Sequence, residues 1–136
     1  MRKFNIHKWA IGEWKFISEA IIRWFNIAIP VMPCWYDFLI EKDGIIKRIQ
    51  VKSVSQIDKS SGWEKIKCML THGSVKGKRW YTSEQVDIIA LYSIHLDIWY
   101  IFPIAEVEWK LTISLFPTVE NSRSKYEIFR NNWNSI

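Results

Sequence analysis

Three polar residues, Asp37, Gln50 and Lys52, occupy matched positions on two neighbouring strand-like runs of the sequence. Asp43-Gly44 lies between the runs and indicates a two-residue hairpin loop, because a type I′ turn needs positive φ at both central positions. Such a loop pairs Lys42 with Ile45, Ile40 with Lys47, Phe38 with Ile49, and Asp37 with Gln50. Since side chains alternate between the faces of a strand, we expect Gln50 and Lys52 on the same side as Asp37.

These residue types suit hydrolysis of a phosphodiester bond. Mg²⁺ takes oxygen ligands and is often held by one or two carboxylates together with substrate phosphate and water. The metal polarises the phosphate and lowers the pKa of bound water, and a nearby lysine can orient that water or offset charge in the transition state. Mn²⁺ is expected to substitute for Mg²⁺. The same spacing also fits a hairpin with a charged outer face, and spacing alone does not separate the two interpretations.

The order Asp37, twelve residues, then Gln50-Val51-Lys52 resembles the PD-(D/E)XK nuclease superfamily, with glutamine in the (D/E) position. The sequence departs from the pattern at two points. No proline precedes Asp37, and Gln50 replaces an acid, as it does in some members of one branch of the superfamily.

Other segments strengthen the resemblance. Gly12-Glu13 opens a predicted helix where the superfamily often carries a further metal-binding glutamate. The segments 86–92 and 99–104 resemble the late hairpin of the group I intron-encoded homing endonuclease branch. The segment 125–133 resembles the C-terminal segment of that branch, so the similarity spans most of the chain.

The resemblance implies an α/β (α+β) fold with a restriction-endonuclease-like core, in which a central mixed β-sheet is flanked by helices. It implies a Mg²⁺-dependent, site-specific DNA endonuclease in which Glu13, Asp37 and Gln50 hold the metal. Lys52 would act on the water or the transition state. The length suits a single domain over residues 1–136, which would cover roughly 600–1,000 Å² of DNA-facing surface. A surface of that size is too small to specify a long DNA site. We therefore expect a homo-oligomer, a dimer or a tetramer, on a pseudo-palindromic site.

Two alternatives stay open. A Holliday-junction resolvase-like enzyme would use the same chemistry but recognise the shape of a four-way junction. A non-catalytic nucleic-acid-binding protein on a nuclease fold is kept open by Gln50, which replaces an acid. Nicking assays with Mg²⁺ on duplex and four-way junction substrates would separate all three functions.

Composition sets limits on the class of protein. Lysine and arginine outnumber aspartate and glutamate by 19 to 14, and this net charge of +5 permits a nucleic-acid partner without requiring one. The two cysteines lie far apart without CxxC spacing, which predicts free thiols and no zinc site. The sequence shows no membrane-spanning stretch and no signal-peptide pattern, so we expect an intracellular protein, cytoplasmic or nucleoid-associated.

Two polar segments, 53–62 and 72–79, are candidates for contact with DNA, and the first also fits a solvated loop. Hydroxyl and basic side chains suit phosphate, and glycines in the second segment permit close approach of the backbone. The predicted DNA-binding residues are Ser53, Ser55, Lys59, Lys76, Lys78 and Arg79. His72 begins the second segment and is given no role, because a lone histidine is more often structural.

Hydrophobic periodicity predicts the other elements. An amphipathic helix over 12–27 should end before Pro30, with Glu13 in its first turn, where the helix dipole favours an acid. The later elements are expected as a strand at 63–71, two buried strands within 85–102, a short helix from Pro103, a strand at 110–115 and a terminal helix at 124–133. Most of the nine tryptophans are expected in the core or at a subunit interface.

Overall fold

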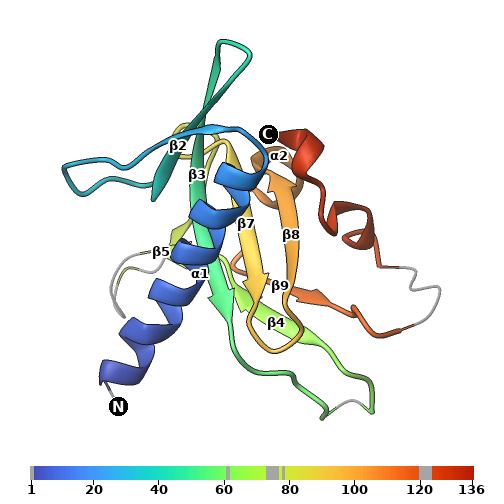
Figure 1. Cartoon of the computed structure of the whole chain (residues 1–136). Helices are drawn as coiled ribbons and strands as arrows, with labels where there is room; N and C mark the ends of the chain where they lie inside the picture. The colour runs from blue at the N-terminus through green and yellow to red at the C-terminus, as the bar shows by residue number, and fades with distance from the viewer. Residues whose placement is uncertain (1, 61, 73–76, 78, 120–123) are drawn as a thin grey trace.

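The computed structural model describes residues 2–60, 62–72, 77, 79–119 and 124–136, with side chains from His7 onward. Its centre is a five-stranded sheet in the order β1-β2-β3-β7-β8 (Figure 1). The strands are β1 (Asn26–Ala28), β2 (Phe38–Lys42), β3 (Ile45–Val54), β7 (Ile88–Ser93) and β8 (Ile98–Pro103). Strands β3 and β7 pair in parallel and the other neighbours pair antiparallel, so the predicted mixed sheet is confirmed.

The predicted register of the β2–β3 hairpin is also confirmed. The observed pairs include Phe38 with Ile49, Ile40 with Lys47, and Lys42 with Ile45. Asp43 and Gly44 have φ values of 53° and 78°, the positive values that a type I′ turn requires. The Asp43-Gly44 turn therefore predicts the alignment of the two strands correctly.

Helix α1 (Arg2–Ile22) crosses one face of the sheet (Figure 1). Phe16 and Ala20 are fully buried against sheet residues such as Ile49 and Ile101. The opposite face carries a second core cluster around Leu91. A separate antiparallel pair, β4 (Ile66–Met69) and β9 (Thr112–Leu115), contributes to that cluster.

The bounds of α1 differ from the prediction at both ends. The helix begins at Arg2, so the segment before residue 12 is helical, and it ends at Ile22, well before Pro30. The residues that follow form β1, which gains hydrogen-bonded pairing along the edge of β2.

A Schellman motif ends α1. Trp24 adopts a left-handed conformation with φ of 62°. Its N–H donates to the Ile21 carbonyl at 3.1 Å, and the Phe25 N–H donates to the Ala20 carbonyl at 2.9 Å. Glycine usually occupies this left-handed position, so a tryptophan there gave no stop signal in the sequence.

The predicted terminal helix at 124–133 is wrong. The chain forms two short 3₁₀ turns, Glu127–Phe129 and Trp133–Ser135. Asn131 lies between them with φ of 50°, and its N–H donates to the Trp99 carbonyl at 2.9 Å. Hydrogen bonding to the neighbouring strand β8 therefore replaces the continuous helical pattern.

The remaining predictions are confirmed in part. Two buried strands, β7 and β8, are present, and α2 (Ile104–Val107) follows Pro103 as expected. Strand β4 is shorter than the predicted strand 63–71 and pairs with β9 outside the central sheet. The segment predicted as a loop at 72–79 contributes to a small antiparallel pair, β5 (Thr71–His72) and β6 (Arg79–Trp80).

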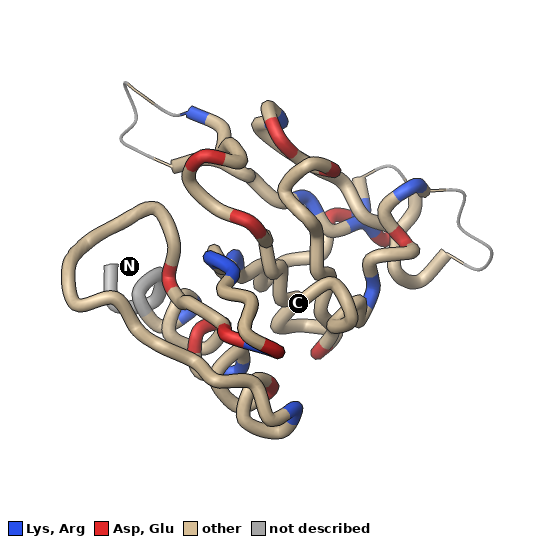
Figure 2. Tube along the Cα trace, turned by 90° about the horizontal axis from the view of Figure 1, so that it is seen from above, with Lys and Arg blue, Asp and Glu red and all other residues tan. Residues whose placement is uncertain are grey.

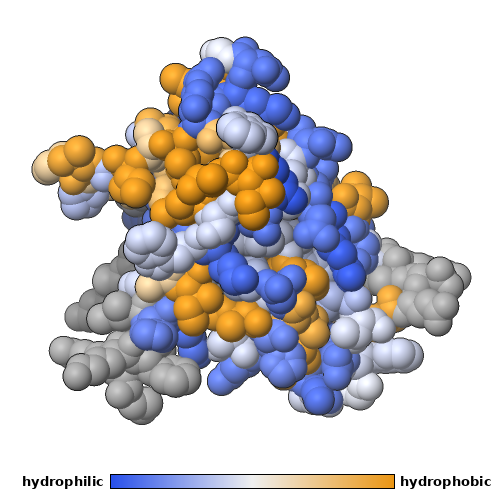
Figure 3. Space-filling view, in the orientation of Figure 1, coloured by the Kyte–Doolittle hydropathy of each residue, from blue (hydrophilic) through white to orange (hydrophobic). Residues whose placement is uncertain are grey.

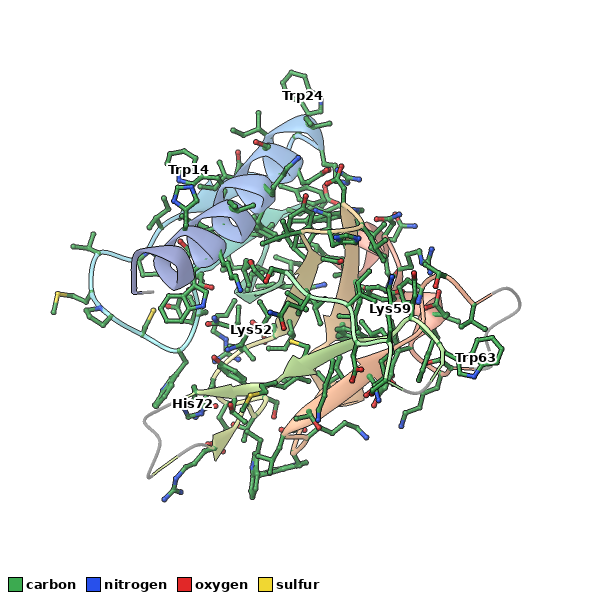
Figure 4. All side chains as sticks on the ribbon, turned by 90° about the horizontal axis from the view of Figure 1, so that it is seen from below. Trp14, Trp24, Lys52, Lys59, Trp63 and His72 are labelled. Atoms are coloured by element: carbon green, nitrogen blue, oxygen red, sulfur yellow. The ribbon has the colours of Figure 1, made fainter. Side chains whose placement is uncertain are left out.

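The tryptophans are mostly not in the core. Trp99 and Trp133 are buried, whereas the other seven have exposed fractions between 40% and 93%. Trp14 projects outward from α1 and Trp24 from the turn that ends this helix, and Trp63 projects at the opposite side of the molecule (Figure 4). A position at a subunit interface stays a prediction for these exposed rings.

Cys34 is exposed, Cys68 is buried, and both are free thiols as predicted. Among the described residues, no helix has the length and apolar character needed to cross a membrane.

Candidate active site

The candidate active site lies where β3 extends beyond β2. Strand β2 starts at Phe38, opposite Ile49, whereas β3 continues to Val54. Positions 50–54 pair with β7 on one side and have no strand partner on the other among the described residues. Helix α1 and the residue before β2 approach this uncovered part of β3, so polar groups from three segments meet there.

Asp37 is held in place by hydrogen bonds to β3. Its N–H donates to the Ile49 carbonyl at 2.9 Å, while its Oδ2 accepts the Val51 N–H at 2.9 Å and Gln50 Nε2 at 3.0 Å. Burial raises the pKa of the Asp37 carboxyl, and the Val51 N–H and the Lys52 ammonium act against that rise. The structure therefore brings Asp37 and Gln50 together, as the hairpin register predicts.

Glu13 reaches the site because Gly12 permits a close approach of α1 to β3. A Cβ atom on Gly12 would lie 1.8 Å from Ser53 Oγ, so a side chain there would force a shift. Burial raises the pKa of Glu13, and the negative charge of Asp37 raises it further. Glu13 lies in the middle of α1 rather than in its first turn as predicted, so the helix dipole does not explain this acid.

Lys52 lies on the same side of β3 as Gln50. Its Nζ donates to the Thr71 carbonyl at 3.0 Å and lies 4.9 Å from the centroid of the Tyr81 ring. Burial lowers the pKa of Lys52, and the side chains of Cys68 and Asp37 act against that fall. Figure 4 shows Lys52 in the interior of the molecule, between α1 and the β4–β5 region.

These side chains line one open pocket of about 1100 Å³. Its lining includes all four predicted catalytic residues, Glu13, Asp37, Gln50 and Lys52. It also includes three predicted DNA-binding residues, Ser53, Ser55 and Lys59. Arg79 is exposed on β6 and is not part of the lining, and Lys76 and Lys78 lie outside the described residues.

The donor set fits a hard divalent cation held by few protein groups. The pKa values of both Glu13 and Asp37 are raised, so a cation between these acids would stabilise their charged forms. In the described part of the chain, no group of three or more His, Cys, Asp or Glu side chains is placed to hold a metal. Mg²⁺ commonly keeps several waters and uses one or two carboxylates, so two acids are sufficient for it.

Gln50 presents its amide nitrogen to Asp37. Nε2 donates to Asp37 Oδ2 at 3.0 Å and to the Val51 carbonyl at 3.2 Å. In this orientation Gln50 anchors the carboxylate. A metal accepts the amide only through its oxygen, so a ligand role requires the amide to turn.

Sequence reasoning gave no role to several residues that line this pocket, among them two aromatic ones. His72 received no role and Tyr81 was not considered, yet both line the pocket. Their position depends on the pairing of β5 with β6. The sequence between those strands has no hairpin signal as specific as Asp43-Gly44.

A family model described as PD-(D/E)XK endonuclease matches residues 7–135. The chain belongs to the PD-(D/E)XK endonuclease family. The matched range contains the whole β2–β3 hairpin and most of α1, including the four predicted catalytic residues. Membership of the PD-(D/E)XK family implies hydrolysis of phosphodiester bonds.

A solved structure supports the same fold. "The structure of a bacterial homing endonuclease: I-Ssp6803I" matches with a TM-score of 0.77 at 22% sequence identity. The match covers 93% of this chain and 88% of that chain. The predicted restriction-endonuclease-like fold with a mixed sheet is thereby confirmed for this PD-(D/E)XK protein. A search of curated proteins gives no match.

Proposed function

We propose that this protein is a Mg²⁺-dependent, site-specific DNA endonuclease of the homing type, and that Mn²⁺ can replace Mg²⁺. The observation that carries the proposal is the convergence of Glu13, Asp37, Gln50 and Lys52 on one pocket. Family membership supplies the class of reaction. The pocket adds acidic oxygen atoms beside an ammonium group, which is the combination that metal-assisted phosphodiester hydrolysis needs.

Each residue has a distinct proposed role. Glu13, Asp37 and the amide oxygen of Gln50 would hold the metal, which when bound supplies charge to polarise the phosphate and activate water. Lys52 would orient the attacking water or offset charge on the phosphate. Among the described residues Lys52 forms no ion pair within 4.0 Å, so no carboxylate contacts its ammonium directly.

DNA is proposed to follow the open pocket. Ser53 lies near the end of β3, Ser55 follows that strand directly, and Lys59 lies on the loop beyond it. The remaining proposed contacts are Lys76, Lys78 and Arg79. Lysine and arginine are spread around the described trace rather than gathered on one face (Figure 2), so local phosphate contacts would position the DNA.

A homo-oligomer, a dimer or a tetramer of one nuclease domain over residues 1–136, is part of the proposal. The support is an exposed apolar face on α1 and the segment after β1 (Figure 3). Its exposed members include Ile21, Ile22, Ile29, Val31 and Met32. Large apolar patches on soluble proteins often mark interaction sites, and two copies would double the DNA surface available for recognition.

Nicking assays test the function directly. The substrates are a supercoiled plasmid pool with random inserts, matched linear duplexes and a synthetic four-way junction. Each is incubated with Mg²⁺, with Mn²⁺ and with EDTA. We expect cutting of a subset of the plasmid pool with either metal and none in EDTA.

The other outcomes identify the alternatives. Cutting confined to the four-way junction would support a resolvase-like enzyme. DNA binding without cutting under any metal condition would support a non-catalytic protein. Full activity in EDTA would contradict the role of the metal.

A further inference from the structure

Neutral groups hold Lys52 in the pocket. Its Nζ donates to the Thr71 carbonyl at 3.0 Å and faces the Tyr81 ring at 4.9 Å from the centroid. An ammonium group has three N–H donors, so the contact with Thr71 leaves donors for water or phosphate. A carbonyl and an aromatic ring therefore fix the lysine without neutralising its charge.

The carbonyl belongs to β5, and the ring belongs to the residue directly after β6. Thr71 pairs with Trp80, and Tyr81 directly follows that residue in the chain. The Tyr81 side chain is 5% exposed, so its ring is enclosed by protein. Pairing of these two short strands thus places the carbonyl and the ring on the same ammonium.

Further rings pack against Tyr81. The His72 ring lies 4.8 Å from the Tyr81 ring at 62°, and the Trp35 ring lies 4.5 Å from the His72 ring at 53°. Trp35 is two residues before Asp37 in the chain. The buried Nε2 of His72 has no hydrogen-bond partner among the described residues. The His72 side chain is therefore held by its contacts with the two neighbouring rings. The three rings connect the segment that carries Asp37 to the side of the pocket that carries Lys52.

We propose that Tyr81 is a positioning residue for Lys52 and that His72 and Trp35 brace the Tyr81 ring. The face of an aromatic ring attracts an ammonium group, most strongly where water is excluded. Tyr81 thereby keeps the ammonium aimed at the pocket. The consequence for cleavage rests on the proposed nuclease function, whereas the geometry can be tested without cleavage.

Nuclear magnetic resonance tests the geometry. The protein is labelled with lysine enriched in ¹³C at Cε, and the Lys52 signal is assigned by its absence in Lys52→Met. Protons above an aromatic face shift upfield, so we expect the Lys52 signal clearly upfield of an exposed lysine such as Lys15. The shift should persist in Tyr81→Phe and disappear in Tyr81→Leu.

Single-turnover cleavage tests the consequence, with a plasmid that the wild-type protein nicks in Mg²⁺. Tyr81→Leu should lower the rate about tenfold or more, because small misplacements of a catalytic group are costly. Tyr81→Phe keeps the ring and should retain the wild-type rate. DNA affinity, measured with Ca²⁺ in place of Mg²⁺, should be unchanged in both variants.

Tyr126→Leu is the matched control. Tyr126 is 9% exposed, packs against Phe102 at 5.7 Å and does not line the pocket. Its replacement should lower the melting temperature and leave the cleavage rate unchanged at temperatures where the variant is folded.

Several results would overturn the proposal. The first is a Lys52 signal in the wild-type protein at the position of the exposed lysines. The second is a wild-type cleavage rate in Tyr81→Leu. The third is a loss of rate in Tyr81→Phe as large as that in Tyr81→Leu. The wild-type signal decides the geometry even if Tyr81→Leu does not fold. Failure of the wild-type protein to nick any DNA would contradict the nuclease proposal instead.

Discussion

Gln50 replaces the acid of the (D/E) position, which leaves the site with one negative charge fewer. The structure shows Gln50 Nε2 donating to Asp37 Oδ2 at 3.0 Å, so the amide also restrains the carboxylate. Glu13 and Asp37 would then provide the negative charge for a metal. Gln50 thus combines two proposed roles, a neutral ligand and an anchor for Asp37.

Substitutions at Gln50 test these roles. Gln50→Glu keeps an oxygen on the same face of β3 and should stay active, with tighter Mg²⁺ binding. Gln50→Leu has similar size and no oxygen, so it should lose cleavage. Its free energy of unfolding should stay within about 1 kcal/mol of the wild-type value. The measurement is single-turnover cleavage across a Mg²⁺ titration, with circular dichroism as the folding control. A wild-type rate in Gln50→Leu would exclude it as a ligand.

For single residues, prediction from the sequence succeeded where the positions are related by local strand and turn geometry. The Asp43-Gly44 turn and the alternation of strand side chains placed Asp37, Gln50 and Lys52 together correctly. Glu13 was found through the family resemblance, because its approach depends on packing between a helix and a strand. Tyr81 was missed because its contact with Lys52 requires the non-local β5–β6 pair.

Among the elements, β3 organises the site because it is longer than β2 and pairs with β7 in parallel. Prediction of strands succeeded for β2 and β3, where a specific turn separates two strand-like runs, and for β7 and β8, where the apolar runs are nearly continuous. It failed at the end of α1, where Trp24 occupies a position usually filled by glycine. The predicted terminal helix at 124–133 was also wrong, because the Asn131 N–H bonds to the Trp99 carbonyl of β8.

The contact between α1 and β3 predicts the effect of Gly12→Ala. A Cβ 1.8 Å from Ser53 Oγ should destabilise the protein by about 1–3 kcal/mol through overpacking, despite the better helix propensity of alanine. Cleavage should fall as well, because Glu13 moves with the helix. The checks are denaturant unfolding and single-turnover cleavage.

A compensating change sharpens that test. Ser53→Ala removes Oγ, so Gly12→Ala with Ser53→Ala should recover most of the lost stability. Gly77→Ala is the control, because a Cβ there would meet no atom of the described residues within 4 Å. Unfolding of Gly12→Ala at the wild-type denaturant midpoint would show that the close approach has no energetic consequence.

Asp87 links β3 to the start of β7 through contacts with Arg48. Its Oδ2 accepts the Arg48 backbone N–H at 2.7 Å, and its Oδ1 accepts the Arg48 guanidinium at 3.0 Å. Burial acts to raise the pKa of Asp87, but the side-chain and backbone hydrogen bonds from Arg48 outweigh it and lower the pKa. The charged carboxylate therefore stabilises the folded state above the unfolded pKa of about 3.9.

This linkage predicts a pH-dependent effect of Asp87→Asn. At pH 7 the variant should be less stable by about 1 kcal/mol, a modest value because the pair is partly exposed and screened. The difference from wild type should shrink as the pH falls below about 4, through the lowered pKa of the folded protein. Urea unfolding at several pH values measures it, and a difference that grows in acid would contradict the sign.

For the whole molecule, the exposed apolar face predicts self-association. Ile21→Lys with Ile29→Lys places two charges on that face, where the wild-type residues are 62% and 65% exposed. We expect sedimentation without DNA to show an oligomer for wild type and a monomer for this variant. The control, Ile128→Lys, lies on the separate turn Glu127–Phe129, is 76% exposed in the wild type, and should remain oligomeric. A monomeric wild-type protein would contradict the interface.

Single-turnover cleavage by Asp37→Asn tests most directly the claim that this pocket is the active site. Asp37 is the acid that accepts hydrogen bonds from both Gln50 Nε2 and the Val51 N–H. The variant should lose at least about a hundredfold in rate in Mg²⁺, the size of effect seen when a preorganised charge-stabilising group is removed. DNA binding in Ca²⁺ should stay within a few-fold, and Asp43→Asn on the exposed hairpin turn should cut normally. Cleavage by Asp37→Asn at the wild-type rate would contradict the assignment of this pocket as the active site.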